Sequence, residues 1–503
     1  MKPLRGKKQE LSDTKRQNSK GRGFMSKILV TGATGFVGKQ LILSLLERGH
    51  EVYAICRIRG TRVFSDDKPN LFYIWGDLRN PDTYREIPQG IDAAYYLVHS
   101  MSGIVANLSD TEEQVARAFV NGIKETGVRQ IIYLGGIIND ERALSPHLKS
   151  RLLVETILNE SKIPTTILRA SLIIGAGSAS FEIIRDLCAK LPWMVVPKWV
   201  KTPCQPIGVQ DVLFYLTGVL LNEACYNKTF DIGGPEVLNF KQLMQNYAAV
   251  GGGKIRMLEV PFLSPRLSSY WLFFVTSVRF SLCYYLVESM KSSTVVRLDE
   301  IQSILPHTCL TYRESIISAM EQTSSHQLVS TWMDAWDTED ENPDIAHYIE
   351  TAKNGGLKDE RRVPIKASRD IVIDRIWRIG GETGYYVFDW AWYLRGILDK
   401  MAGGIGLNRG RRDPAEIHVG DSIDFWRVLV ADKKKGCLLL LSNMKVPGKA
   451  WLSFQLVENG TGTYLVQTAL FQPSGILGYL YWYSLYPIHC FLFQKMAKAI
   501  GKA

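Results

Sequence analysis

The sequence predicts an α/β protein in which a doubly wound parallel sheet precedes a separate α+β domain. From residue 27 onward, short β-branched runs alternate with helical segments, which indicates parallel strands joined by crossover helices. These runs are apolar without strict alternation, as in strands that are buried on both faces. Beyond residue 363, consecutive strand-like runs are followed by one long apolar helix. The length of 503 residues suffices for two to four packed domains.

Six strands are predicted in the first part, with helices between them. The strands are expected at residues 27–31, 51–57, 71–77, 93–99, 130–135 and 165–169. Helices fit residues 36–47 and 110–126, and the second of them begins with acidic side chains that suit the positive end of a helix dipole. After Gly177 the pattern loosens into longer helices and loops, up to about residue 325.

The second part is expected to begin after an acidic linker at residues 326–362, so that domains are predicted at 25–325 and 363–503. A short strand comes first, followed by helices at 370–377 and 390–401. Strands are then predicted at 422–430, 437–444, 450–457 and 463–471, and a long helix at about 475–499. An antiparallel sheet with a long C-terminal helix is typical of a helix-grip fold.

The net charge of +10 is concentrated at the start of the chain, where residues 1–24 hold eight basic and two acidic side chains. We interpret this tail as a disordered extension, or as an upstream start before Met25. An arm that binds nucleic acid or lipid is the minority reading. Since the rest of the chain is nearly balanced, we expect no nucleic-acid partner.

Cysteine and hydrophobic patterns bear on location. The eight cysteines are scattered and form no CxxC pair, which favours reduced thiols in a cytoplasmic protein, with neither disulfides nor a metal site. Residues 475–493 are uncharged, but they contain Pro487, His489 and several tyrosines, which suit a buried or interfacial helix. We therefore expect no transmembrane span, whereas peripheral membrane contact stays open.

The glycine-rich segment Thr31-Gly-Ala-Thr-Gly-Phe-Val-Gly38 directly follows the first strand and opens a helix. Gly32 permits the tight turn, Gly35 lets the backbone approach a pyrophosphate, and Gly38 lets the helix pack closely on the sheet. The helix N-terminus then offers N–H groups to the phosphates. This context predicts a Rossmann dinucleotide site that includes Gly32, Thr34, Gly35, Phe36, Val37 and Gly38.

The end of the second strand bears on the choice of cofactor. A site for NAD(H) would place Asp or Glu there, to bind the ribose 2′-hydroxyl. This chain has Arg57 there, with Arg59 close by. Because Arg binds phosphate through paired hydrogen bonds, NADP(H) is predicted over NAD(H).

With Gly76-Asp-Leu78 and Tyr96-Leu-Val-His-Ser-Met101, the glycine motif resembles an atypical, extended-type short-chain dehydrogenase/reductase over roughly residues 27–290. The resemblance implies that Asp77 and Leu78 contact the adenine end and that Leu97, Val98 and His99 line the nicotinamide-side ribose. Residues 169–175, 205–212 and 230–234 occupy the family's substrate-side segments.

The last part of the chain is similar to an uncharacterised bacterial domain, through motifs such as Ile376-Trp-Arg-Ile-Gly-Gly381 and Asp424-Phe-Trp-Arg427. That domain resembles the START and polyketide-cyclase-like helix-grip superfamily, whose members enclose hydrophobic ligands. The resemblance implies a small hydrophobic or lipid-like ligand for this chain.

Where the reductase family has a catalytic Tyr with Lys four residues later, this chain reads Ser145-Pro-His-Leu-Lys-Ser-Arg151. His147 falls at the Tyr position and Arg151 at the Lys position, so these two are the candidate catalytic residues. A histidine, with an ordinary pKa of about 6.5, suits general acid–base catalysis. The alternative is that His147 only begins a helix along which Arg151 lies.

Two functions from different classes remain open at this stage. One is an NADPH-dependent reductase that acts on a hydrophobic small molecule. The other is a non-catalytic NADP(H)-binding redox sensor, or a lipid-binding or assembly protein, which the lost Tyr–Lys pair favours. A sugar-nucleotide epimerase ranks third for lack of that pair. Neither the substrate nor the oligomeric state is predicted.

Overall fold

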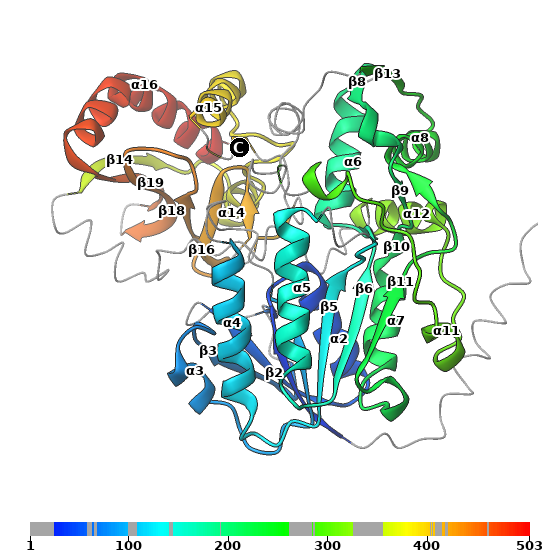
Figure 1. Ribbon diagram of the computed structural model, residues 1–503. Helices are drawn as coiled ribbons and strands as arrows, with labels where there is room; N and C mark the ends of the chain where they lie inside the picture. Colours follow the sequence, from blue (N-terminus) through cyan, green and yellow to red (C-terminus); the bar gives the residue numbers. More distant parts are fainter. Residues whose placement is uncertain are drawn as a thin grey trace, which may run out of the picture.

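The computed structural model describes residues 25–57, 63–64, 68–98, 108–139, 144–191, 193–260, 284, 287–324, 356–402, 404, 406–407, 415–417, 421–459 and 462–502 (Figure 1). The predictions for the tail at 1–24 and for Arg59 therefore lie outside the described residues. Within the described part of the chain, no helix is both long enough and apolar enough to cross a membrane.

The first part is built on a sheet of seven parallel strands in the order β11-β6-β5-β4-β1-β2-β3. Their bounds are β1 Lys27–Thr31, β2 Glu51–Cys56, β3 Leu71–Trp75, β4 Ala93–Tyr96, β5 Gln130–Gly136, β6 Thr165–Ala170 and β11 Lys228–Ile232. The predicted parallel sheet is confirmed. The sequence analysis missed β11, because this edge strand is isolated from the regular alternation and pairs only with β6.

Helices cover both faces of this sheet (Figure 1). α2 (Phe36–Glu47) and α7 (Val209–Gly218) pack on one face, and α3 (Pro81–Arg85), α4 (Leu108–Ile123) and α5 (Pro146–Asn159) pack on the other. Along β1, Ile28 and Val30 join the core on the α2 side, whereas Leu29 joins the core on the α4 side. Neighbouring side chains of a strand point to opposite faces of the sheet. All three are fully buried because helices cover both faces. The doubly wound prediction is thus confirmed.

A smaller unit has a core of its own, and its elements come partly before and partly after β11 in the chain. It contains α6 (Ala179–Lys190), α8 (Phe240–Val250), α12 (Tyr312–Ser324) and a parallel pair, β8 (Trp193–Pro197) with β13 (Arg256–Val260). Their shared core includes Phe181, Leu243 and Ile316. Shorter elements complete this region: β7 Ile173–Ile174, η2 Lys198–Lys201, β9 Pro203–Cys204, β10 Ile207–Gly208, η3 Glu223–Cys225, β12 Leu238–Asn239 and α11 Ile301–Ile304.

The second part has its own antiparallel sheet, in the order β14-β19-β18-β17-β16-β15. The strands are β14 Leu357–Pro364, β15 Ser422–Ile423, β16 Trp426–Asp432, β17 Cys437–Ser442, β18 Gly448–Asn459 and β19 Gly462–Pro473. β14 begins inside the segment predicted as a linker. Its charged sequence is not typical of a strand, but the buried Asp359 forms an ion pair of 2.6 Å with Arg361 on the same strand.

The strand predicted at 422–430 is two strands, β15 and β16, that pair with each other. Between them Asp424 has a left-handed backbone (φ 54°), which reverses the chain. The buried carboxylate of Asp424 accepts hydrogen bonds from the backbone N–H of Gly381 at 3.2 and 3.3 Å. Asp is one of the few residue types that adopt this conformation readily, and no apolar pattern reveals it.

Three helices accompany the second sheet: α14 (Arg369–Trp377), α15 (Asp389–Met401) and α16 (Gly475–Gly501). One core joins them to the strands and includes Trp377, Trp392 and Met496. The separate α+β domain is therefore confirmed, with its long C-terminal helix against the sheet (Figure 1). The helix-grip assignment stays a prediction.

The contact between α15 and α16 is polar at its centre. Arg395 donates hydrogen bonds to the hydroxyl of Tyr481 at 2.6 Å and to Nε2 of His489 at 3.1 Å. Burial, and then the charge of Arg395, lower the pKa of His489 to about 4. His489 is therefore neutral in the folded protein at physiological pH.

We expect this histidine to make the stability of the second part depend on pH. Because the pKa is about 4 when folded and about 6.5 when unfolded, the unfolded state binds the extra proton first as the pH falls. The free energy of unfolding should decrease, by up to about 3 kcal/mol, as the pH falls from above 6.5 to about 4. Denaturant unfolding followed by tryptophan fluorescence measures this decrease. In His489→Gln, compared with wild type relative to pH 8, the free energy of unfolding should depend less on pH. Equal pH dependence in both proteins would contradict the lowered pKa of His489.

Candidate functional site

The strand order places the ends of β1 and β4 side by side at the carboxyl edge of the first sheet. β4 pairs with one side of β1 and β2 with the other, so the chain connections leave in opposite directions at this point. In open α/β sheets, such a switch point forms a crevice where ligands bind. The hydroxyl of Thr31 closes the junction, because it donates to the carbonyl of Tyr95 (3.0 Å) and accepts from the N–H of Leu97 (3.3 Å).

Two of the three motif glycines are required by the fold itself. Gly32 has φ of +67°, and a Cβ atom there would lie 2.5 Å from the carbonyl oxygen of Leu97. A Cβ at Gly38 would lie 2.2 Å from the carbonyl oxygen of Gly32. Any side chain at either position would collide with backbone.

Gly35 differs from both. A Cβ there would meet only the carbonyl oxygen of Gly32, at 3.1 Å, so packing demands glycine much less at this position. Gly35 is the N-cap of α2, and among the described residues no side chain caps this helix. The first N–H groups of α2 thus offer positive potential beside a backbone without a side chain, which suits a phosphate.

The remaining residues of this loop are half-buried. Phe36 lies against Gly175, where an added Cβ would come within 3.1 Å of the ring. Val37 packs against the core between the sheet and α2. Thr34 is also half-buried.

Charged residues gather at the ends of β2 and β3. Arg57 is exposed directly after β2, and its charge acts on Asp77, which follows β3. Burial alone would raise the pKa of Asp77, but hydrogen bonds and charge from Arg79, with a smaller effect of Arg57, lower it overall. Arg79 contacts both carboxylate oxygens of Asp77, at 2.6–3.1 Å. Asp77 is therefore ionised, and Leu78 beside it is buried.

The predicted residues after β4 are only partly described. Leu97 and Val98 are half-buried at the end of the strand. His99 lies outside the described residues. The structure thus brings Gly32 and Leu97 together, as the sequence analysis expected of neighbouring strand ends.

The first turn of α5 holds the candidate catalytic residues. Ser145 caps the helix by accepting from the N–H of Leu148, and the half-buried His147 follows Pro146. One turn later, Arg151 donates to the hydroxyl of Tyr133 at 3.3 Å. Burial raises the pKa of this Tyr133 hydroxyl, and the charge of Arg151 opposes the rise. Arg151, one of the two candidate catalytic residues, is therefore bound to a strand of the sheet.

Sequence reasoning missed Tyr133. Tyr133 is fully buried in β5, and nothing in the sequence around it marks it as a partner of Arg151. The proximity comes from the packing of α5 on β5. The apolar context of QIIYLGG fits a strand without indicating a polar contact.

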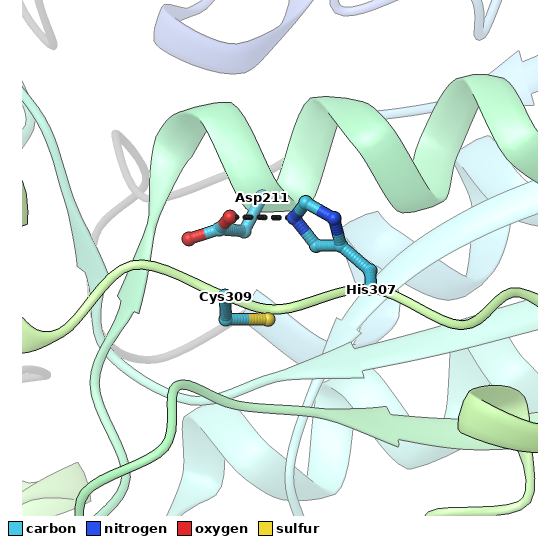
Figure 2. Close-up of side chains that lie close together, drawn as sticks. All are labelled: Asp211, His307 and Cys309. Carbon is cyan, nitrogen blue, oxygen red and sulfur yellow. Dashed lines mark hydrogen bonds and ion pairs between the residues drawn. The ribbon is translucent and has the colours of Figure 1, made fainter. Parts of the chain in front are cut away.

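A second cluster joins α7 to the segment at 307–310 (Figure 2). Nε2 of His307 lies 2.8 Å from a carboxylate oxygen of Asp211, and the N–H of Leu310 donates to the other oxygen at 3.2 Å. Cys309 completes a group whose potential ligand atoms all lie within 4.8 Å of one another. The expectation of no metal site had overlooked that His307 stands two residues from Cys309.

The contacts within this cluster account for its geometry without a cation. Asp211 already bonds through both oxygens, and the hydroxyl of Tyr215 lies 3.6 Å from Sγ of Cys309. Burial raises the pKa of the Cys309 thiol, so the thiolate that metals bind is disfavoured. We therefore interpret the cluster as a tether for the 307–310 segment.

Next to the cluster lies a cavity of about 480 Å³. Its wall combines parts of two of the three predicted substrate-side segments, Gln205 and residues 231–234, with Gln302 and His307. The lining also includes Asp231 and Asp299. Most of the wall is nevertheless apolar, through side chains such as Ile232, Val296 and Ile301, as is usual in pockets that bind small molecules.

Each part of the chain matches one protein family. Residues 32–185 match a family described as NAD(P)H-binding, and residues 352–496 match one described as a protein of unknown function (DUF2867). A photosystem II assembly factor, Ycf39 of Trieres chinensis, is 22% identical over 49% of this chain and 76% of its own. The chloroplastic divinyl chlorophyllide a 8-vinyl-reductase of Arabidopsis thaliana is 22% identical over 41% of this chain and 53% of its own.

Among solved structures, the Bordetella bronchiseptica enzyme WbmG in complex with NAD is similar over 62% of this chain and 97% of its own. The TM-score is 0.49 and the sequence identity 14%.

We predict that Gly35→Asp abolishes NAD(P)H binding while the fold persists, because the new side chain would occupy the phosphate approach with a negative charge. Gly38→Ala is the matched control, and it should instead lower the melting temperature, since its methyl group meets backbone at 2.2 Å. Fluorescence titration with NADPH and thermal unfolding separate the two effects. Unchanged NADPH affinity in Gly35→Asp would refute the assignment of the loop.

Proposed function

We propose that this chain is an NADP(H)-dependent reductase of a hydrophobic small molecule, because residues 32–185 match an NAD(P)H-binding family and lie in the doubly wound parallel sheet. The observation that carries the proposal is the glycine loop at the switch point, with Arg57 at the end of the neighbouring strand. A loop that leaves Gly35 open beside an uncapped helix has the features that a dinucleotide needs.

The preference for NADP(H) follows from charge. Arg57 is exposed where a 2′-phosphate would lie, and the nearby Asp77 is already held by Arg79. An acidic partner for the ribose 2′-hydroxyl is missing at the end of β2. We assign Asp77 and Leu78 to the adenine end, and Leu97, Val98 and His99 to the nicotinamide side.

The bound dinucleotide would supply a hydride. His147 lies in the first turn of α5, which begins at the carboxyl edge of the sheet, and we propose that its imidazole delivers the proton. Arg151 would position the helix through Tyr133 and hold it against β5. Transfer to an activated carbon–carbon double bond depends less on a Tyr–Lys pair than carbonyl reduction does. The name of the Arabidopsis relative describes reduction of such a vinyl group.

The second part would hold the apolar portion of the substrate. Its core between sheet and helices contains buried polar atoms that lack a protein hydrogen-bond partner among the described residues, including Nε1 of Trp392 and Nδ1 of His489. Buried polar groups of this kind are normally satisfied by water or by a ligand. They support the helix-grip prediction of an enclosed ligand.

A non-catalytic role is the second candidate. The contact between Arg151 and Tyr133 favours it, because the side chain at the Lys position already has a structural partner in the core. In that case NADP(H) would report redox state or stabilise an assembly protein. The similarity to a photosystem II assembly factor is compatible with this role.

We expect Arg57→Gln to weaken NADPH binding by roughly ten- to a hundredfold, since a bidentate, charge-assisted contact to phosphate would be lost. NADH affinity should stay unchanged, because NADH carries no 2′-phosphate. Titrations with both cofactors provide the measurement, and Arg85→Gln, an exposed arginine of α3, is the control. Equal loss for both cofactors would exclude a phosphate role for Arg57.

We expect turnover of NADPH with a panel of enones, quinones and aldehydes, and a decrease of roughly a hundredfold in His147→Gln. Lys149→Gln, an exposed change on the same helix, should retain the wild-type rate. NADPH oxidation at 340 nm is the measurement, with cofactor affinity checked in each variant. Tight NADPH binding without turnover on any member of the panel would favour the non-catalytic role.

A further inference from the structure

The second part of the protein carries large apolar side chains on its surface, on two helices that contact each other. Soluble proteins rarely expose contiguous apolar patches, and such patches generally mark an interaction surface. On α15 every exposed position after Asp389 is large and apolar: Trp390, Tyr393, Leu394, Ile397, Leu398 and Met401. The spacing of three and four residues places these side chains on one stripe of the helix.

The first five turns of α16 also expose many large apolar side chains, although Ser484 is exposed among them. Its exposed large apolar side chains are Ile476, Leu477, Tyr479, Leu480, Tyr483, Tyr486, Ile488 and Phe491. Ile476 is 80% exposed and Leu477 71%, so these residues are not marginal core positions. The opposite side of α16 already faces the core through Trp482, Phe493 and Met496. We call the exposed residues of α15 and α16 together the apolar face.

Side-chain contacts join α15 to α16. Arg395 of α15 bonds Tyr481 and His489 of α16, and Trp392 packs beside Phe493 with ring centroids 6.3 Å apart. Figure 1 shows the two helices next to each other. Both stripes of the apolar face are therefore carried by helices that these side-chain contacts join.

The charged side chains of α16 are all lysines. This helix contains no Asp or Glu over its 27 residues. Beyond Phe491 its exposed stripe continues with Lys495 and Lys498, and Nζ of Lys495 lies 5.6 Å from the ring centroid of Phe491. Long lysine side chains of this kind keep their stems on apolar surface while the ammonium group meets water or phosphate.

We propose that the apolar face docks on the surface of an anionic phospholipid bilayer. Tyr and Trp, which supply five of its exposed side chains, favour the boundary between lipid tails and headgroups. Lys495 and Lys498 would meet lipid phosphates, and the aliphatic residues would enter the acyl boundary, as in helices that lie in the membrane plane. An acid-free helix matches a negatively charged surface better than it matches another copy of a chain with the same lysines.

This surface lies on the second part of the chain and does not depend on the proposed reductase function. The test uses the full chain and sucrose-loaded vesicles of phosphatidylcholine, with and without phosphatidylglycerol. Sedimentation should carry the protein down with the anionic vesicles, less at high salt, and less again with phosphatidylcholine alone.

Two variants separate the apolar and the charged contributions. Leu394→Glu with Leu480→Glu should lower the vesicle partition coefficient at least roughly tenfold, because two exposed apolar side chains that would enter the bilayer are replaced by charges. Lys495→Gln with Lys498→Gln should lower it by roughly fivefold for each lysine on anionic vesicles only. Val237→Glu with Leu258→Glu, exposed apolar residues of the first part, should bind as wild type does.

All these positions are exposed, so each variant should fold, and its NADPH affinity and circular dichroism check this. Wild-type protein that stays in the supernatant with anionic vesicles at low salt would overturn the proposal. So would apolar-face variants that sediment as wild type does. A dimer that forms without vesicles and is dissolved by Leu394→Glu with Leu480→Glu would assign the face to a second copy instead.

Discussion

The close approach of β1 to the end of β4 is the constraint on which the cofactor site depends. Gly32 turns the chain in a left-handed conformation directly against the backbone of Leu97. Thr31 bonds across the same junction. Since a side chain at Gly32 or Gly38 would strike backbone, the start of α2 and the carboxyl end of β1 hold one arrangement. That arrangement leaves Gly35 open, and a phosphate can approach the helix there.

Buried polar contacts hold α5 on the first sheet. Arg151 of α5 donates a hydrogen bond to the hydroxyl of Tyr133 in β5. Glu155, one turn further along, forms an ion pair of 2.6 Å with Arg169 of β6. These contacts stabilise α5 on the sheet through buried polar groups. His147 is half-buried in the first turn of the same helix, directly after Pro146.

The second part combines a conventional core with an unconventional surface. Its aromatic residues pack between sheet and helices, where Tyr385 stacks on Trp392 with centroids 4.3 Å apart. Yet α15 buries Asp399, whose carboxylate accepts from the N–H groups of Gly406 and Lys445 at 2.8 and 2.7 Å, and exposes apolar residues instead. Binary patterning alone would orient α15 the other way round, with its apolar stripe inward.

Sequence by itself determined the alternation of strands and helices, the glycine loop and the order of elements in the second part. Each is a local property: hydrophobic period, turn chemistry or a motif directly after a strand. It predicted β1 and α2 to the residue. It also predicted Arg57 at the end of β2, because the end of an apolar run and a charged residue after it are both visible in the local sequence.

Tertiary structure decided what depends on distant neighbours. β11 belongs to the sheet only through its pairing with β6, and Asp424 breaks a predicted strand because Gly381 satisfies its carboxylate. The partners of Arg151 and Asp211 are separated from them by 18 and 96 residues, so no local pattern could reveal them. Apolar residues also occupy both sides of α15 and α16, so the sequence does not show which side of each helix is buried. Packing against the second sheet and the hydrogen bonds of Arg395 determine the buried side.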